Sequence, residues 1–304
     1  MDVILGLAVN VLQEGFIYGI MAIGVYITYQ VLGFPDLSVD GTFPLGACIT
    51  GVLISMGVNP WLACLLAFAG GALAGCVTGF LHVKLKITDL LSGILVMTAL
   101  WSVNLGITQG NAVVQFFNQP TIFNSGLGAL LPQKPIDTHF VLMGLLVVLA
   151  VKLLIDLYLK TKSGLLLRAS GDNPQFVTSL GQDSGRMKII GLAIGNGCTA
   201  LAGSILSQQS ESANIYSGTG MVVMALASVI IGTSIFKKVK FMKPTTAVVF
   251  GAILYKVCLV VAMQLGLPAN YMKLLMAVIF TIALVSNNMF SGRRKKQNVN
   301  PTQI

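Results

Sequence analysis

Long apolar segments recur from the beginning of the chain almost to its end. A bilayer core about 30 Å thick is crossed by roughly 20 helical residues at 1.5 Å per residue. Hydrophobic residues make up 55% of the 304 residues and charged residues only 10%, whereas soluble domains carry about 25% charged residues. The sequence therefore predicts an all-α, polytopic membrane protein, because lipid offers no partner to a free backbone N–H or C=O group.

Nine segments have the length and apolarity of membrane spans. Helices are predicted rather than a β-barrel, which would show short alternating strands. The whole chain, 1–304, is expected to form one transmembrane domain. The predicted spans are 15–33, 38–57, 60–81, 88–108, 139–159, 188–208, 219–236, 244–264 and 271–290.

The basic residues are unevenly placed along the chain. None of the 19 Lys and Arg residues precedes Lys84. The later ones cluster at alternate ends of the predicted spans, as positive-inside topology requires; the clusters are HVKLK (82–86), the stretch 160–188, FKKVKFMK (236–243) and SGRRKKQ (291–297).

This charge pattern predicts the sides of the membrane. It places the loop 160–188 and a basic C-terminal tail, 291–304, in the cytoplasm, and the loop 109–138 outside. The N-terminus is then outside if all nine segments cross. We interpret the basic excess as topology signals and lipid headgroup contacts, and not as a nucleic-acid surface.

Motifs of catalysis and metal binding are missing from the sequence. There is no GxSxG, HExxH or GxxxxGK[ST] motif, the five cysteines lie in apolar segments without a CxxC pair, and the two histidines stand apart. We therefore expect no catalytic residue, no metal site and no cofactor bound by this chain.

The stretch FPDLSVDGTF, residues 34–43, places two of only ten acidic residues between apolar runs. A proline and a glycine interrupt helix here, and Asp36 or Ser38 could cap a helix that begins near Val39. If every segment crosses, this motif lies at the cytoplasmic end of the first helices. If 38–57 is re-entrant, the motif lies nearer the midplane, and the topology before Lys84 inverts.

The predicted cytoplasmic loop contains the signals of a short helix. Asn173 suits an N-cap, Pro174 the first helical position, and Gly181 a left-handed stop. A helix of under two turns is not stable alone in water, so we expect it to dock into a partner's groove. A helix lying on the membrane surface is the alternative. Its apolar side chains are Phe176, Val177 and Leu180.

The stretch GLLLRASGDNPQFVTSLGQDSGRMKIIGLAIGNGCTALAG resembles the cytoplasmic coupling region of ATP-binding-cassette (ABC) importer permeases in the branched-chain amino acid and ribose permease superfamily. The segment 36–39, Asp-Leu-Ser-Val, resembles an element of the sugar permeases. Asp40-Gly41, followed by Leu45-Gly46-Ala47, is most similar to the tryptophan/tyrosine-type permeases. The matching residues of the coupling region are Gly164, Arg168, Ala169, Asn173, Gly181, Ala202 and Gly203.

The resemblance implies a permease domain of about nine to ten membrane segments with interrupted or re-entrant helices. It implies a transport subunit of the cell membrane without an ATPase site. Two ABC ATPase subunits would bind the ATP, and an extracytoplasmic substrate-binding lipoprotein would face the loop 109–138. The family acts as a permease pair, and a homodimer is the simpler assumption. The cargo would be a small molecule, an amino acid by resemblance, with a sugar or nucleoside left open.

The resemblance and the polar residues within the predicted spans together give candidate residues for two roles. ATPase coupling would involve Arg168, Asn173, Pro174, Phe176, Val177, Leu180 and Gly181. Candidates for the translocation pathway are Asp36, Ser38, Asp40, Asn104, Asn196 and Lys256.

These pathway candidates also have structural interpretations. The 34–43 motif is interpreted as a hinge with Asp36 as a cap, and direct substrate contact by Asp40 is the alternative. Asn104 and Asn196 are mid-span amides that more often form interhelical hydrogen bonds. Lys256 serves either helix packing or the pathway.

Lys152 and Asp156, four residues apart in one span, are expected to pair.

The sequence leaves two other classes of protein to consider, a secondary active transporter and a membrane-embedded enzyme. A secondary active transporter would need an ion-coupling carboxylate in mid-membrane, and Asp156 is the candidate. A membrane-embedded enzyme would need a catalytic constellation that the sequence does not contain.

Overall fold

The computed structural model describes residues 2–126, 128, 138–239, 241–268 and 271–297. Parts of the predicted external loop and of the basic tail lie outside these residues. The α-helices are α1 (Asp2–Val25), α2 (Val39–Ser55), α3 (Pro60–Val83), α4 (Asp89–Ile107), α5 (Thr138–Tyr158), α6 (Lys162–Asp172), α7 (Pro174–Ser179), α8 (Ser184–Gln209), α9 (Met221–Ile235), α10 (Pro244–Gln264) and α11 (Met272–Gln297).

Shorter elements join these helices. The π-helix η1 (Tyr26–Val31) continues α1, and the 3-10 helices η3 (Ile215–Gly218) and η4 (Phe236–Lys238) flank α9. The short strands β1 (Val113–Gln115) and β2 (Ser212–Asn214) pair antiparallel, with Val114 opposite Ala213.

The described residues contain seven helical segments that are long and apolar enough to cross a membrane, and the chain is a multi-pass membrane protein. Two shorter apolar helices, Val39–Ser55 and Met272–Val285, accompany them, so the predicted count of nine to ten segments is not confirmed. Most helix bounds lie close to the prediction. The first helix is the exception, since it begins at Asp2 and not at residue 15, because polar residues before Gly15 diluted its apolar signal.

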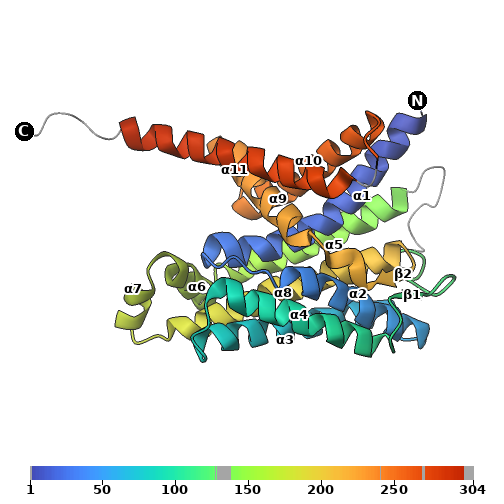
Figure 1. Cartoon of the computed structure of the whole chain (residues 1–304), viewed down its shortest axis with the longest axis horizontal. Helices are drawn as coiled ribbons and strands as arrows, with labels where there is room; N and C mark the ends of the chain where they lie inside the picture. The colour runs from blue at the N-terminus through green and yellow to red at the C-terminus, as the bar shows by residue number, and fades with distance from the viewer. Residues whose placement is uncertain (1, 127, 129–137, 240, 269–270, 298–304) are drawn as a thin grey trace, which may run out of the picture.

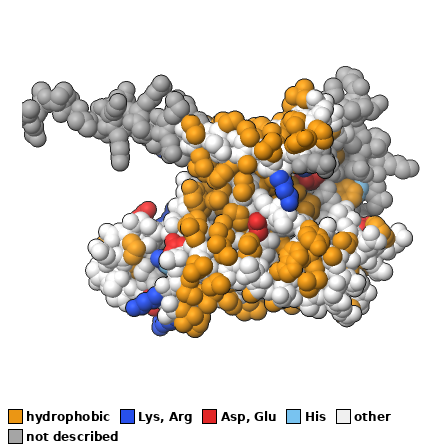
Figure 2. Space-filling view, in the orientation of Figure 1, with side chains coloured by type: hydrophobic (Ala, Val, Ile, Leu, Met, Phe, Trp, Pro, Cys, Tyr) orange, Lys and Arg blue, Asp and Glu red, His pale blue; other side chains and the backbone are white. Residues whose placement is uncertain are grey.

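The two ends of the molecule carry different elements (Figure 1). The helices α6 and α7 lie at one end, together with the C-terminal end of α11, and the strands β1 and β2 lie at the other. Figure 2 shows Lys and Arg side chains gathered at the end that carries α6 and α7, while hydrophobic side chains cover the middle. The loops predicted to face opposite sides of the membrane are thus at opposite ends.

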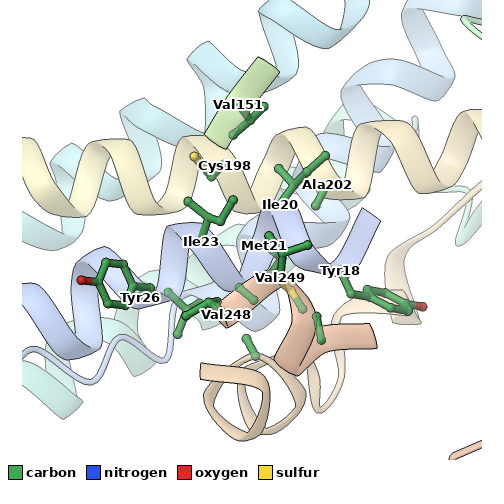
Figure 3. Close-up of a cluster of buried hydrophobic side chains, with 14 of the residues drawn as sticks. Tyr18, Ile20, Met21, Ile23, Tyr26, Val151, Cys198, Ala202, Val248 and Val249 are labelled. Atoms are coloured by element: carbon green, nitrogen blue, oxygen red, sulfur yellow. The ribbon is translucent and has the colours of Figure 1, made fainter. Parts of the chain in front are cut away.

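Helix α1 lies at the centre of the hydrophobic core. It packs against α5, α8, α9 and α10. Figure 3 shows Ile20, Met21 and Ile23 of α1 between Cys198 of α8 and Val248 of α10. These side chains are buried, so α1 joins α8 on one side to α10 on the other.

Small residues bring α3 close to α8. Gly71 and Gly75 lie against the α8 backbone, and a Cβ on Gly75 would collide with the carbonyl oxygen of Leu192. Glycine at this spacing lets two helices approach closely. Gly71 lies against the backbone of Asn196 in α8, whose side chain bonds the 34–43 motif.

Candidate functional site

The chain between η1 and α2 is non-helical beside the middle of a membrane helix. The motif lies against Asn196, which is halfway along α8, and Gly93, one turn into α4, abuts the backbone of Leu37. The motif thus borders both the middle of α8 and the first turn of α4, and its depth in the membrane stays a prediction. Non-helical backbone within a membrane requires protein or water around it.

Four buried polar side chains satisfy one another in this region. Asn196 donates from Nδ2 to Oδ2 of Asp36 at 2.6 Å, and its Oδ1 accepts from the hydroxyls of Ser38 at 3.0 Å and Thr42 at 2.8 Å. Asp36 also accepts the Ser38 backbone N–H at 2.9 Å. Asp36 thus bonds the residue just before α2, and no capping bond from the Ser38 hydroxyl to α2 is present. The interhelical role of Asn196 is confirmed.

Asp40, in the first turn of α2, holds the start of α9. Its Oδ2 accepts the backbone N–H of Gly220 at 3.1 Å, and its Oδ1 accepts that of Val222 at 2.8 Å. The first N–H groups of a helix lack partners within the helix, and a carboxylate there is favoured by the helix dipole. Gly220 has φ +90° and lets the chain turn into α9. Asp40 therefore connects two helices that both begin inside the bundle.

A cavity of about 270 Å³ lies between α2, α4 and the segment that precedes α9. Asn104 Nδ2 donates to the Gly41 carbonyl oxygen at 3.2 Å, as expected of an interhelical amide. Its Oδ1 has no hydrogen-bond partner among the described residues, although Asn104 is only 1% exposed. The lining includes Asp40, Gly41, Pro44, Trp101, Asn104 and Thr219.

Lys256 lies apart from this cavity. It forms an ion pair with Glu14 and so links α10 to α1. Its ammonium group also lies 5.8 Å from the ring centroid of Tyr18. Of the two interpretations of Lys256, the contacts favour helix packing.

Asp156 is paired as the sequence predicted, and it has further partners. Lys152 lies 3.3 Å from its Oδ2 and Lys243 lies 2.9 Å from the same atom. The Thr245 hydroxyl donates to Oδ1 at 2.7 Å. This group fastens the start of α10 to α5.

The predicted short helix is present as α7. The Asn173 side chain accepts the backbone N–H of Phe176 at 3.1 Å, and Gly181 ends the helix with φ +71°. Phe176 and Leu180 are exposed, whereas Val177 is fully buried in its own chain. The outward face is therefore formed by Phe176 and Leu180 and not by Val177. Pro174 begins α7, and the exposed Arg168 lies in the preceding α6.

No group of three or more His, Cys, Asp or Glu side chains among the described residues could hold a metal ion. The polar residues instead form a satisfied network, a helix cap and a cavity wall.

A family model described as the branched-chain amino acid transport system / permease component matches residues 7–284. The chain belongs to this family. The permease is 41% identical to a tyrosine transport system permease protein of Clostridioides difficile, over 94% of its own length and 93% of the relative. It is 27% identical to the ribose import permease protein of Escherichia coli, over 73% of its length and 68% of the relative.

These similarities confirm the resemblance drawn from the coupling region and the 34–43 motif, including the similarity to a tyrosine permease. A protein of Rickettsia prowazekii described as uncharacterized is 29% identical over 93% of the permease. No solved structure matches the permease. Its homologues are permease components of transport systems and not enzymes.

Proposed function

We propose that this permease is the membrane-spanning subunit of an ABC importer that carries an amino acid into the cytoplasm. ATP would be bound by two ATPase subunits, and a substrate-binding lipoprotein outside the cell would deliver the cargo. Two copies of the permease would form the pathway in the cell membrane, with the C-terminus in the cytoplasm.

The observation that carries this proposal is the exposed apolar face of α7. Phe176 on the six-residue helix and Leu180, its C-cap residue, are exposed at the end of the molecule that bears the basic residues. Such a helix depends on its buried residue for its position, because it is too short to be stable alone. An anchored helix with an outward aromatic side chain is suited to a groove on a partner.

The amino acid as cargo rests on similarity to the tyrosine permease, which extends over nearly the whole of both chains. The ribose permease is more distant and shares a smaller part of its length. We therefore place an amino acid ahead of a sugar.

The alternative of a secondary active transporter is less well supported. Asp156 was its candidate carboxylate, and it is held by Lys152 and Lys243. Glu14, another acid within a span, is paired with Lys256. Carboxylates engaged in such pairs are poorly suited to bind and release a coupling ion.

The proposal is tested with purified proteins in liposomes. The permease alone should hydrolyse no ATP, whereas the complex with its ATPase should show activity that rises when the loaded binding protein is added. Uptake of tyrosine, leucine and ribose is compared in the same vesicles. Uptake that needs an ion gradient but neither ATP nor the ATPase would overturn the proposal.

A further inference from the structure

We infer that the cavity between α2, α4 and the start of α9 is a binding site for an amino acid that carries an aromatic side chain. The inference rests on the proposed function, since a permease must have a binding site where its cargo leaves water. It goes further by placing the ammonium, the carboxylate and the ring of the cargo against named groups.

The ammonium group of the cargo would lie between Asp40 and Asn104. The Asp40 carboxylate is fixed by backbone N–H groups at the start of α9, so it is an oriented anion on the cavity wall. The Asn104 amide nitrogen is engaged by the Gly41 carbonyl oxygen, which can only accept, and Oδ1 is left as an acceptor without a described partner. A buried acceptor of this kind is costly unless a ligand or water satisfies it.

The carboxylate of the cargo would lie beside Lys273 at the start of α11. The Lys273 ammonium donates to the Thr219 hydroxyl at 3.3 Å, and Thr219 lines the cavity. Lys273 is exposed, and Thr219, which it contacts, lines the same cavity as Asp40. Asp40 and Lys273 thus present opposite charges at one cavity, which suits a zwitterion.

This part of the surface differs from a face that contacts only lipid. Charges within a membrane are expensive, and they mark substrate pathways or partner contacts. A cavity with polar groups at this place can be filled by water when cargo is absent.

The side chain of the cargo would contact Trp101. Trp101 is 38% exposed, lines the cavity and packs edge-on against Tyr216 with ring centroids 5.2 Å apart. Met97, Pro44 and Ile215 complete an apolar wall. Aromatic rings stack favourably in such offset or edge arrangements, so this wall favours a ring over a short aliphatic side chain.

The lining of the cavity favours an aromatic amino acid over a sugar. The cavity volume of about 270 Å³ lies just below the usual range of ligand pockets, roughly 300–1,000 Å³, and so suits one small molecule. A sugar needs hydrogen-bonding groups around its whole circumference, whereas much of this lining is apolar, although Thr98 and Asn104 flank Trp101 on α4. The combination of charged groups with a ring contact matches an aromatic amino acid.

The two tryptophans of the chain provide a direct test. Trp61, in the first turn of α3, is also 38% exposed and does not line the cavity. In the Trp61→Phe permease, Trp101 is the sole tryptophan, and adding L-phenylalanine should change its fluorescence saturably. The matched Trp101→Phe permease, with Trp61 alone, should show no such change.

Two analogues test the recognition of the zwitterion. Phenylethylamine lacks the carboxylate and phenylpropionate lacks the ammonium group, and each should bind at least about tenfold more weakly than L-phenylalanine, the usual worth of a charged hydrogen bond. Lys273→Met should weaken phenylalanine binding by about the same factor and leave phenylethylamine binding unchanged. Lys86→Met, an exposed lysine between α3 and α4, is the control and should change neither.

Each outcome bears on the inference separately from the proposed function. If Trp101 shows no saturable response while the reconstituted importer takes up amino acids, the site is overturned and the proposed function stands. Equal weakening of both ligands by Lys273→Met would also overturn the placement of the carboxylate. A response to ribose and none to phenylalanine would overturn both the site and the amino acid as cargo.

Discussion

Asn196 of α8 donates from Nδ2 to Oδ2 of Asp36 across 2.6 Å, although the two residues are 160 positions apart in the chain. The bond fixes the non-helical segment before α2 against the middle of a continuous helix. It lies in a buried group where each polar side chain is another's partner. The start of α2 is therefore positioned by α8 and not by a surface loop.

Replacing Asn196 should destabilise the whole permease. In Asn196→Ala the carboxylate of Asp36 and the hydroxyls of Ser38 and Thr42 lose their buried partner. We expect a loss of about 2–3 kcal/mol in the free energy of unfolding, seen as a lower melting temperature in detergent. Thr199→Ala is the control, since the Thr199 hydroxyl bonds only the Gly195 carbonyl oxygen of its own helix. Equal melting temperatures for the two variants would contradict this role.

Substitutions of two neighbouring residues of α7 should have different effects, one on ATPase binding and the other on stability. Phe176→Ala should leave stability unchanged and weaken association with the ATPase at least about tenfold, because a docked aromatic side chain often contributes about 2 kcal/mol or more. Val177→Ala should lower the free energy of unfolding by roughly 1–3 kcal/mol, since it opens a buried site. Co-purification and thermal unfolding measure the two effects. An ATPase complex of full affinity and full transport with Phe176→Ala would rule out α7 as the coupling helix.

The N-cap of α7 should matter for the same partner. In Asn173→Ala the backbone N–H of Phe176 loses its acceptor, which costs about 1 kcal/mol of helix stability. We expect a weaker ATPase complex than the wild type forms, but a smaller loss than in Phe176→Ala. Thr178→Ala is a matched control, since the Thr178 hydroxyl bonds only the Pro174 carbonyl oxygen within α7. A greater effect of Thr178→Ala than of Asn173→Ala would contradict the capping role.

The ion pair between Glu14 and Lys256 should contribute to the stability of the folded permease and not to transport. Glu14→Gln leaves the Lys256 charge without its partner, and such a change costs about 3–5 kcal/mol when the pair is buried. The double variant Glu14→Leu/Lys256→Met should recover most of that loss, because an apolar pair needs no solvation. Thermal unfolding and uptake are measured together. A double variant that is stable but does not transport would show that Lys256 serves the pathway.

The sides of the membrane can be tested by cysteine labelling in a variant without its native cysteines. A cysteine at Ser163 of α6 should react with a membrane-impermeant thiol reagent only after the cells are opened. One at Asn118, an exposed residue after β1, should react in intact cells. Labelling of Ser163→Cys from outside would invert the topology.

Much of the helix layout could be predicted from hydropathy and capping residues. The bounds of α3, α4 and α10 follow from uninterrupted apolar runs, and α7 follows from Asn173 and Gly181, because caps and stops are local signals. The start of α1 was missed, since Asn10 and Glu14 reduce the mean hydropathy of a segment that is nonetheless helical.

The candidate site could be predicted only in part. Asp40 and Asn104 stood out as polar residues in apolar runs, but their shared cavity depends on how α2 packs against α4. Thr42, Trp101 and Lys273 were missed. Hydroxyl and aromatic residues are ordinary in membrane helices, and a lysine at a helix end normally indicates only the edge of the membrane. The bonds of Thr42 and the roles proposed for Trp101 and Lys273 depend on tertiary contacts that no local pattern contains.

The mutual satisfaction of Asp36, Ser38, Thr42 and Asn196 has an evolutionary consequence. Asn196 is the shared partner of the other three side chains, so a substitution of Asn196 leaves all three without it, and such a single change passes through an unstable intermediate. Across related permeases, these four positions should therefore change together or not at all. Permeases that have lost these hydrogen bonds should have apolar side chains at all four positions. The original four polar residues should then be difficult to regain one residue at a time.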